Sequence, residues 1–189
     1  VTGAQCAAKG AGEFLRLQLL IDRGYHPLAY RVMCLQAHYR SELEFSWENL
    51  RAALTRLKRM LIAAERLHGV EAVAGEHPKL APMLASFDAA ISDDLNTPIA
   101  LTALEDVLAA KKVDLGLKRA MVERMDSVLG LDLLGKTRVD LRLRPKAATI
   151  EDAAIEAVLE QRKAARAEKD FAASDALRDE LTAAGVEVM

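Results

Sequence analysis

Apolar residues recur every three or four positions along most of the chain, which is the period of an amphipathic helix. Ser46 is a suitable N-cap for the longest such segment, and Gly69 is a suitable residue to end it. The apolar stripes of four consecutive segments are Leu50, Leu54, Leu57 and Leu61; Leu80, Leu84, Phe87 and Ile91; Leu101, Leu104 and Leu108; and Met121, Val122, Met125 and Leu129. Their short connections predict a four-helix bundle between Trp47 and Gly130.

Local signals mark further elements and boundaries around this bundle. Phe14–Ile21 and the segment that begins at Pro27 each predict a short helix before the bundle. Within the bundle, Thr97 is expected to cap the helix that has Pro98 in its first turn. After the bundle, residues 137–144 alternate strictly between polar and apolar side chains, which predicts an extended segment that lies along a surface.

The C-terminal segment predicts two consecutive helices and a short strand. Thr149 is a suitable N-cap for the first helix, and the carboxylates of Glu151 and Asp152 favour its positive N-terminal end. We expect the second helix to end at Gly185 and residues 186–188 to form one edge strand. The fold class is therefore predicted to be all-α, with a small, mostly helical module after the bundle.

The composition agrees with a helical protein and excludes several other classes. Of the 189 residues, 51% are hydrophobic and only 4% are aromatic, which is typical of helical proteins. No apolar run reaches the roughly 18 residues of a membrane span, and the N-terminal sequence lacks the layout of a secretory signal. Cys6 and Cys34 form no CxxC pair, so we expect two free thiols. The chain does not begin with Met, which indicates a fragment or a processed chain.

The charge distribution limits where a nucleic acid could bind. The net charge is −2, so a binding surface would have to be local. Residues 1–70 carry 10 Lys and Arg against 6 Asp and Glu, whereas residues 71–135 carry 6 against 11. Residues 136–146 carry five cations, including Arg142 and Arg144, against one Asp.

A second local concentration of positive charge lies in the first helix of the C-terminal segment. Arg162, Arg166 and Lys169 recur at i, i+4 and i+7, which predicts three cations on one helix face. Such a face is suited to RNA. The alternative is that the three side chains form solvated pairs with Glu160, Glu168 or Asp170.

The sequence offers no convincing catalytic or metal-binding arrangement. The four histidines are scattered, and none pairs with another potential ligand at the spacing of a zinc site. Asp93 and Asp94 are expected to form a helix-entry turn rather than a magnesium site, because Asn96 and a Thr-Pro pair follow. Tyr39 and Phe171 could each stack on a base, but we expect both to be core residues.

Three motifs in the same order resemble cysteinyl-tRNA synthetase. The first is GYHPLAYR at residues 24–31, which leads to HYRS at 38–41. The second is DDLNTP at 93–98, where Leu95 replaces the usual Phe. The third is the tail pattern around Arg162, Arg166, Lys169, Asp175 and Arg178. The resemblance runs over nearly the whole chain, from about residue 3 to residue 188.

The resemblance implies a domain order and a set of tRNA-binding residues. Residues 1–14 would be a remnant of the nucleotide-signature loop, 15–46 stem-contact helices, 47–135 a four-helix anticodon-binding bundle, 136–148 a basic linker and 149–189 a C-terminal anticodon-recognition module. The residues expected to contact tRNA are Arg162, Arg166, Lys169, Arg178, Arg142 and Arg144.

The resemblance also implies that the catalytic half is missing from this chain. The family's second nucleotide signature, KMSKS, should fall just before residue 12, where this chain has CAAKG and only Lys9 matches a lysine of the signature. Lys9 is therefore the one candidate for ATP binding. No catalytic residue, cofactor or metal ligand is expected here, and ATP and zinc are expected only in the missing catalytic half.

Three functions remain open at this point. The chain is either the tRNA-binding part of a cysteine–tRNA ligase or a stand-alone, non-catalytic RNA- or protein-binding module derived from one. The related cysteine ligase of thiol biosynthesis is a third option, but its small sugar substrate has no need of the C-terminal module. The first hypothesis predicts cysteine tRNA as partner, no DNA or membrane binding, a monomer, and a cytoplasmic location. The chain alone is not expected to be an enzyme.

Overall fold

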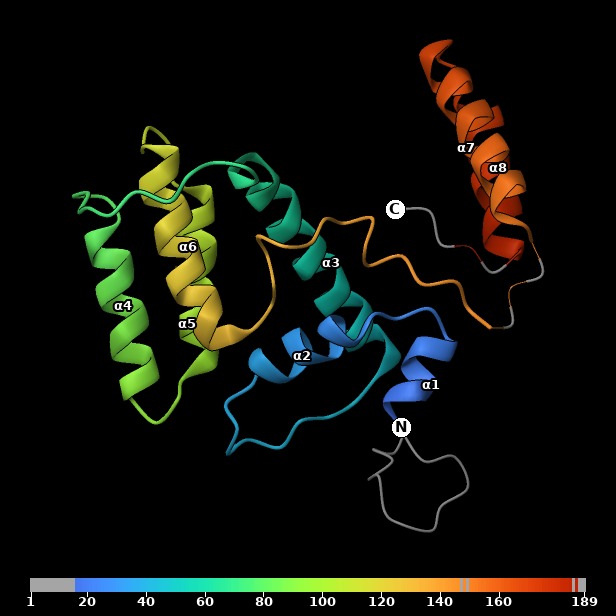
Figure 1. Ribbon diagram of the computed structural model, residues 1–189. Coiled ribbons are helices and arrows are strands. Elements are labelled where there is room, and N and C mark those ends of the chain that lie inside the picture. Colours follow the sequence, from blue (N-terminus) through green and yellow to red (C-terminus); the bar gives the residue numbers. More distant parts are fainter. Residues whose placement is uncertain (1–15, 147, 149, 185, 187–189) are drawn as a thin grey trace. The chain divides into compact units, whose positions relative to one another are not determined.

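The computed structural model describes residues 16–146, 148, 150–184 and 186, and all regular structure within these residues is helical (Figure 1). The predicted all-α fold class is therefore confirmed. Of the predicted edge strand, Val186 is described and is not in a strand, while residues 187–189 lie outside the described part. Thr149 and Gly185, predicted to bound the two C-terminal helices, also lie outside it.

The chain divides into two compact units, the first ending at Leu143 and the second beginning at Arg144. This boundary falls inside residues 136–148, the segment predicted to be a linker. The helices of the first unit are α1 (Leu17–Asp22), α2 (Pro27–Leu35), α3 (Trp47–Ala64), the short 3-10 helix η1 (Glu65–Leu67), α4 (Ala81–Ser92), α5 (Thr97–Ala109) and α6 (Leu115–Leu129). Those of the second unit are α7 (Asp152–Ala167) and α8 (Phe171–Ala183). None of the described helices is long and apolar enough to cross a membrane.

The longest helix, α3, forms where its sequence predicts and supplies much of the core. The Ser46 hydroxyl oxygen accepts a hydrogen bond from the Asn49 backbone N–H at 3.0 Å, which satisfies a donor that the helix itself cannot pair. Leu50, Leu57 and Leu61 are fully buried, and α3 packs against α2 and α5. The predicted apolar stripe is therefore the core face of the helix.

Helices α4, α5 and α6 lie side by side in the first unit (Figure 1). The α4–α5 connection differs in one detail from the prediction, because Asn96 rather than Thr97 occupies the N-cap position of α5. Thr97 is already helical, and Asp94 and Leu95 before it adopt left-handed backbone angles with φ of 55° and 54°. The helix therefore begins at Thr97, one residue earlier than it would if Thr97 were the N-cap.

The extended segment predicted for residues 137–144 is wrong over its first half, which forms turns. The Asp140 carboxylate accepts hydrogen bonds from the backbone N–H and the hydroxyl of Thr137, at 2.7 and 2.8 Å. The Arg142 N–H donates to the Val139 carbonyl in the same segment. Leu141 is buried, while Val139 is 56% exposed. Local side-chain hydrogen bonds thus determine the backbone here, although the side chains alternate with a period of two.

A polar contact joins α2 to the end of α6. The Arg31 Nε–H donates to the Leu129 carbonyl at 2.8 Å, and Gly130 follows in the left-handed conformation with φ of 66°. The Asp126 carboxylate accepts from the backbone N–H groups of Leu131 and Leu133, at 2.8 and 2.7 Å. Burial raises the pKa of Asp126, although these two hydrogen bonds oppose the shift. The predicted end of α6 at Gly130 is confirmed.

Replacing Gly130 should destabilise the protein more than replacing another left-handed glycine. An alanine Cβ at Gly130 would lie 2.7 Å from Arg31 Nη2, whereas a Cβ at Gly69, where φ is 72°, would meet nothing within 4 Å. Both Gly→Ala changes should lower the free energy of unfolding by roughly 1–2 kcal/mol through backbone strain. Gly130→Ala should lower it by about 1 kcal/mol more, because Arg31 must move away from the Leu129 carbonyl.

Urea denaturation of Gly69→Ala, Gly130→Ala, Arg31→Ala and the Arg31→Ala/Gly130→Ala double variant would measure these losses of stability. Gly130→Ala should then lower the free energy of unfolding by about 1 kcal/mol less in the Arg31→Ala background than in the unmodified chain, because Arg31 no longer has to move. Equal losses for Gly69→Ala and Gly130→Ala would show that the contact with Arg31 has no energetic role.

Candidate nucleic-acid interface

The second unit is a hairpin of two antiparallel helices with a thin core. The inward-facing residues of α7, including Ile155 and Leu159, are only half-buried. On α8, Ser174 and Leu181 are buried. The Asp170 carboxylate caps α8 by accepting from the Ala173 N–H at 3.0 Å. The hairpin therefore exposes most of its side chains.

Only two of the three predicted RNA-binding cations, Arg162 and Arg166, lie on one side of α7, because the helix ends before Lys169. Arg162 is half-buried on the face of α7 that also carries Ile155 and Leu159, and its Nε is buried without a hydrogen-bond partner. Arg166 is exposed in the last turn of α7. Lys169 lies beyond the end of α7, with φ of 63°. The prediction of one helical stripe is therefore wrong.

The end of α7 has an identifiable cause. The Lys169 N–H donates to the Arg166 carbonyl and the Asp170 N–H to the Ala165 carbonyl, which is the hydrogen-bond pattern of a Schellman motif. Glycine usually occupies the left-handed position of that motif, and here the position holds Lys169. Because no glycine marks this position in the sequence, the prediction extended α7 beyond its actual end at Ala167.

The turn of the hairpin brings together two exposed cations and an exposed aromatic ring. Phe171, the first residue of α8, is 63% exposed, and Lys169 and Arg166 are exposed just before it in the chain. The expectation that Phe171 is a core residue is therefore wrong. The same expectation is wrong for Tyr39, which is 60% exposed. A hairpin with so thin a core has little interior in which to bury a phenyl ring.

The remaining predicted cations of the hairpin are engaged with neighbouring groups. Arg178 on α8 pairs with Asp175 at 3.2 Å and Asp179 at 3.0 Å. Its hydrogen bond to Asp179 raises the pKa of Arg178. Arg144 donates from Nη2 to the Ile150 carbonyl at 2.8 Å and from Nη1 to the Asp152 carboxylate at 3.3 Å. Arg144 thus holds the start of α7, a structural role that its place in a basic segment did not reveal.

Two of the predicted site residues lie outside the second unit. Arg142 is exposed near the end of the first unit. Lys9 lies outside the described residues, as does the whole predicted nucleotide-signature loop. Within the described residues, no three His, Cys, Asp or Glu side chains are grouped so that they could hold a metal ion. Cys34 is a free thiol, as expected.

Two motifs that are far apart in the sequence meet in the first unit. The Asp94 carboxylate accepts a hydrogen bond from the Tyr39 hydroxyl at 2.6 Å and pairs with Arg40 Nε at 3.1 Å. His38 Nε2 lies 3.8 Å from the same carboxylate. The hydrogen bond to Asp94 raises the pKa of Tyr39. Asp94 was expected only to shape its own turn; its side chain also holds the loop between α2 and α3.

The comparisons with known proteins agree with the motifs and the fold. Residues 151–189 match the family model of the cysteinyl-tRNA ligase anticodon binding domain. The cysteine–tRNA ligase of Novosphingobium aromaticivorans is 66% identical over 184 residues, which cover 96% of this chain and 37% of that protein. The enzyme of Zymomonas mobilis is 43% identical over 215 residues, covering 96% of this chain and 42% of that protein.

The chain belongs to the cysteine–tRNA ligase family. It corresponds to the C-terminal portion of these enzymes and spans about two fifths of the length of the relatives it matches. The anticodon-binding domain match contains both α7 and α8. In this family member, the exposed residues at the hairpin turn are therefore part of the anticodon-binding domain.

The different positions of Arg162 and Arg166 predict different effects on stability. Arg162→Met keeps the apolar stem of the side chain and removes a buried N–H donor that has no partner. In this variant α7 should unfold no more easily than in the unmodified chain, and the free energy of unfolding should rise by up to about 1 kcal/mol. The matched change Arg166→Met at an exposed position should stay within about 0.5 kcal/mol of the unmodified chain. Amide hydrogen exchange along α7 in the whole chain would measure both.

Clear destabilisation by Arg162→Met, with Arg166→Met neutral, would mean that the Arg162 guanidinium itself holds the hairpin together. An Arg162→Glu variant provides the opposite control, because it places a shorter, negatively charged group at the same half-buried position. We expect this variant to destabilise α7.

Proposed function

We propose that this chain is the tRNA-binding part of a cysteine–tRNA ligase and that its second unit binds the anticodon of cysteine tRNA. The observation that carries this proposal is the match of residues 151–189 to the anticodon binding domain. The exposed side chains of Arg166, Lys169 and Phe171 at the hairpin turn support it, because they belong to that domain.

These three side chains suit the bases of a single-stranded RNA loop. Unstacked bases are bound by stacking on aromatic rings and by hydrogen bonds to their edges, and an Arg side chain can supply both. In this proposal Phe171 stacks on a base, Arg166 donates hydrogen bonds to a base edge and Lys169 neutralises phosphate. Arg178 and Arg142 contact the backbone, while Arg144 supports the start of α7 and Arg162 lies half-buried in the hairpin.

For the whole protein we propose the reaction that the relatives' name states, the joining of cysteine to tRNA. ATP and zinc would be bound by the portion of the relatives that this chain does not span. The protein would act as a monomer in the cytoplasm, where tRNAs are used. The stand-alone module remains the alternative hypothesis, and no contact described above favours it over the ligase.

A tRNA-binding experiment tests the proposal. The purified chain should bind cysteine tRNA more tightly than an unrelated tRNA, with affinity that falls steeply as salt rises. The Arg166→Ala/Phe171→Ala double variant should bind more weakly by about 1–3 kcal/mol for each base that it no longer holds, and most of the preference for the cysteine anticodon should disappear. Fluorescence anisotropy with both tRNAs at low and moderate salt would measure these effects.

Lys163→Ala is the matched control, because Lys163 is an exposed cation on α7 that already pairs with Glu160 at 3.5 Å. It should leave the anticodon preference unchanged. Equal affinity of the unmodified chain for both tRNAs would contradict anticodon recognition, and no binding even at low salt would contradict the RNA-binding function itself.

A further inference from the structure

The turn between α4 and α5 has an unusual backbone for its residue types. Asp94 and Leu95 are consecutive, and both are left-handed, with φ of 55° and 54°. Residues other than glycine adopt this conformation at a cost in free energy, and such strain persists only where surrounding contacts hold it. Leu95 is 55% exposed, so packing of its side chain contributes little to holding the turn.

The Asp94 carboxylate joins this turn to three consecutive residues of the loop between α2 and α3. Besides their contacts with Asp94, His38, Tyr39 and Arg40 contact one another. Arg40 Nε donates to the Tyr39 hydroxyl oxygen at 3.0 Å, and the Arg40 backbone N–H donates to His38 Nδ1 at 3.3 Å. The rings of His38 and Tyr39 are stacked, with centroids 5.0 Å apart. We call these four residues the Asp94 network.

The two segments that the Asp94 network joins have little apolar burial of their own. In the loop, residues 36–38 are half-buried and residues 39–44 are exposed. In the turn, residues 92–95 are all exposed. Segments with few buried contacts open at a lower free energy than the core does. The polar contacts of the Asp94 network are therefore important for keeping both segments in place.

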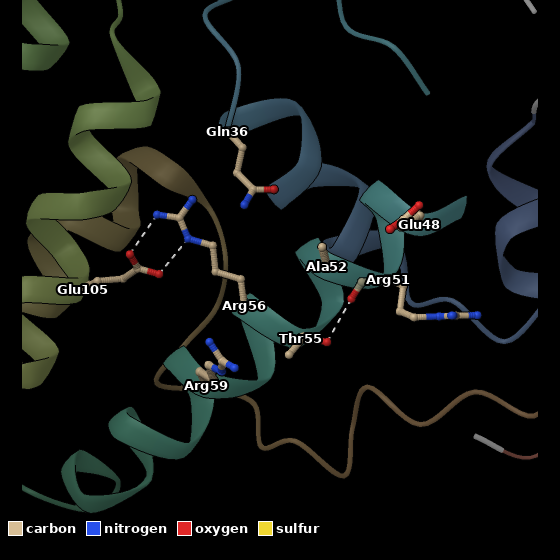
Figure 2. A pocket seen from close by; sticks show the side chains of 8 residues that line it. All are labelled: Gln36, Glu48, Arg51, Ala52, Thr55, Arg56, Arg59 and Glu105. Carbon is tan, nitrogen blue, oxygen red and sulfur yellow. Dashed lines mark hydrogen bonds and ion pairs between the residues drawn. The ribbon is translucent and has the colours of Figure 1, made fainter. Parts of the chain in front are cut away.

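Another arginine–carboxylate contact of the first unit shows the difference. Arg56 donates to both carboxylate oxygens of Glu105, at 2.7 and 2.8 Å, and Figure 2 shows Arg56 reaching from α3 toward this partner. Both residues lie within helices that bury several leucines, so the core holds the two backbones with or without the pair. The Asp94 network instead joins two irregular segments, and its loss should release both.

We propose that the Asp94 network is a latch that couples the loop 36–44 to the α4–α5 turn, so that the two segments open together while the core stays folded. The carboxylate holds the loop, and the loop in return holds Asp94 and Leu95 in their left-handed conformation. Because coupling between two segments is reciprocal, a molecule that binds one of them in its latched form also stabilises the other. The inference does not depend on the proposed function, since it concerns contacts within the first unit.

Amide hydrogen exchange, measured residue by residue in the whole chain, tests the latch. The Ser41 N–H, which donates to the His38 carbonyl at 2.8 Å, reports on the loop; the Asn96 N–H, which donates to the Ala90 carbonyl at 2.8 Å, reports on the turn. Tyr39→Phe removes one hydroxyl from the loop and leaves the sequence of the turn unchanged. It should speed exchange at both reporters by the same factor, roughly two- to fivefold, the range expected for an exposed charged pair.

Two changes in the turn test the coupling in the other direction. Asp94→Asn keeps the shape of the side chain and its tolerance of left-handed backbone but removes the charge, so it should also speed exchange at both reporters. Leu95→Asn should have the opposite effect, because Asn occurs in left-handed backbone several times more often than most residues. It favours the latched turn, and exchange at Ser41 in the loop should slow by roughly threefold.

Two variants serve as matched controls. Asp93→Asn makes the same charge change as Asp94→Asn at the neighbouring exposed position, and it should leave exchange at Ser41 unchanged. Glu105→Gln weakens the pair shown in Figure 2 and should leave exchange at both reporters unchanged.

Three results would overturn the proposal. If Tyr39→Phe changes exchange at Ser41 alone, or if Leu95→Asn leaves Ser41 unchanged, the loop and the turn are not coupled. If neither Tyr39→Phe nor Asp94→Asn changes exchange at either reporter, the network does not hold the two segments. If Asp94→Asn speeds exchange in the middle of α3 and α5 as much as at the reporters, the network supports the whole unit and is no separate latch.

Discussion

Burial of one face of α3 is the constraint on which the first unit depends. Leu50, Leu57 and Leu61 are removed completely from solvent, and α2 and α5 pack against the same helix. When one face of a helix is fixed in this way, the direction of its other face is fixed as well. The arginines of α3 lie on its outer side because the leucines point inward, and α5 lies close enough for Glu105 to bind Arg56. Core packing and surface charge are therefore two results of one helical period.

The sequence predicted those parts of the fold that depend on residues close together in the chain. The Ser46 cap, the leucine stripe of α3 and the end of α6 at Gly130 each follow from side chains within one or two helical turns. The errors arise where one short-range interaction overrides a periodic pattern. Asp140 forms a turn in an alternating segment, and Lys169 occupies a backbone position at which glycine is usual.

The candidate site was less predictable for a different reason. The charged residues of the hairpin can be read directly from the sequence, but their exposure depends on how thin the core of a two-helix unit is. Arg162 is half-buried and Phe171 is exposed, the reverse of what residue type alone suggests. Contacts such as Asp94 with Tyr39, which are 55 residues apart, and Glu105 with Arg56, which are 49 residues apart, depend on tertiary structure. No local pattern in the sequence predicts these contacts.

The thin core of the hairpin links its folding to its ligand. No residue of α7 is buried, and on α8 only Ser174 and Leu181 are, so little apolar burial opposes the loss of chain entropy when the hairpin forms. A ligand that binds only the folded hairpin adds its own binding free energy to that balance. RNA would thus do more than occupy the second unit, because mass action would make the population of folded hairpin increase with the concentration of free tRNA.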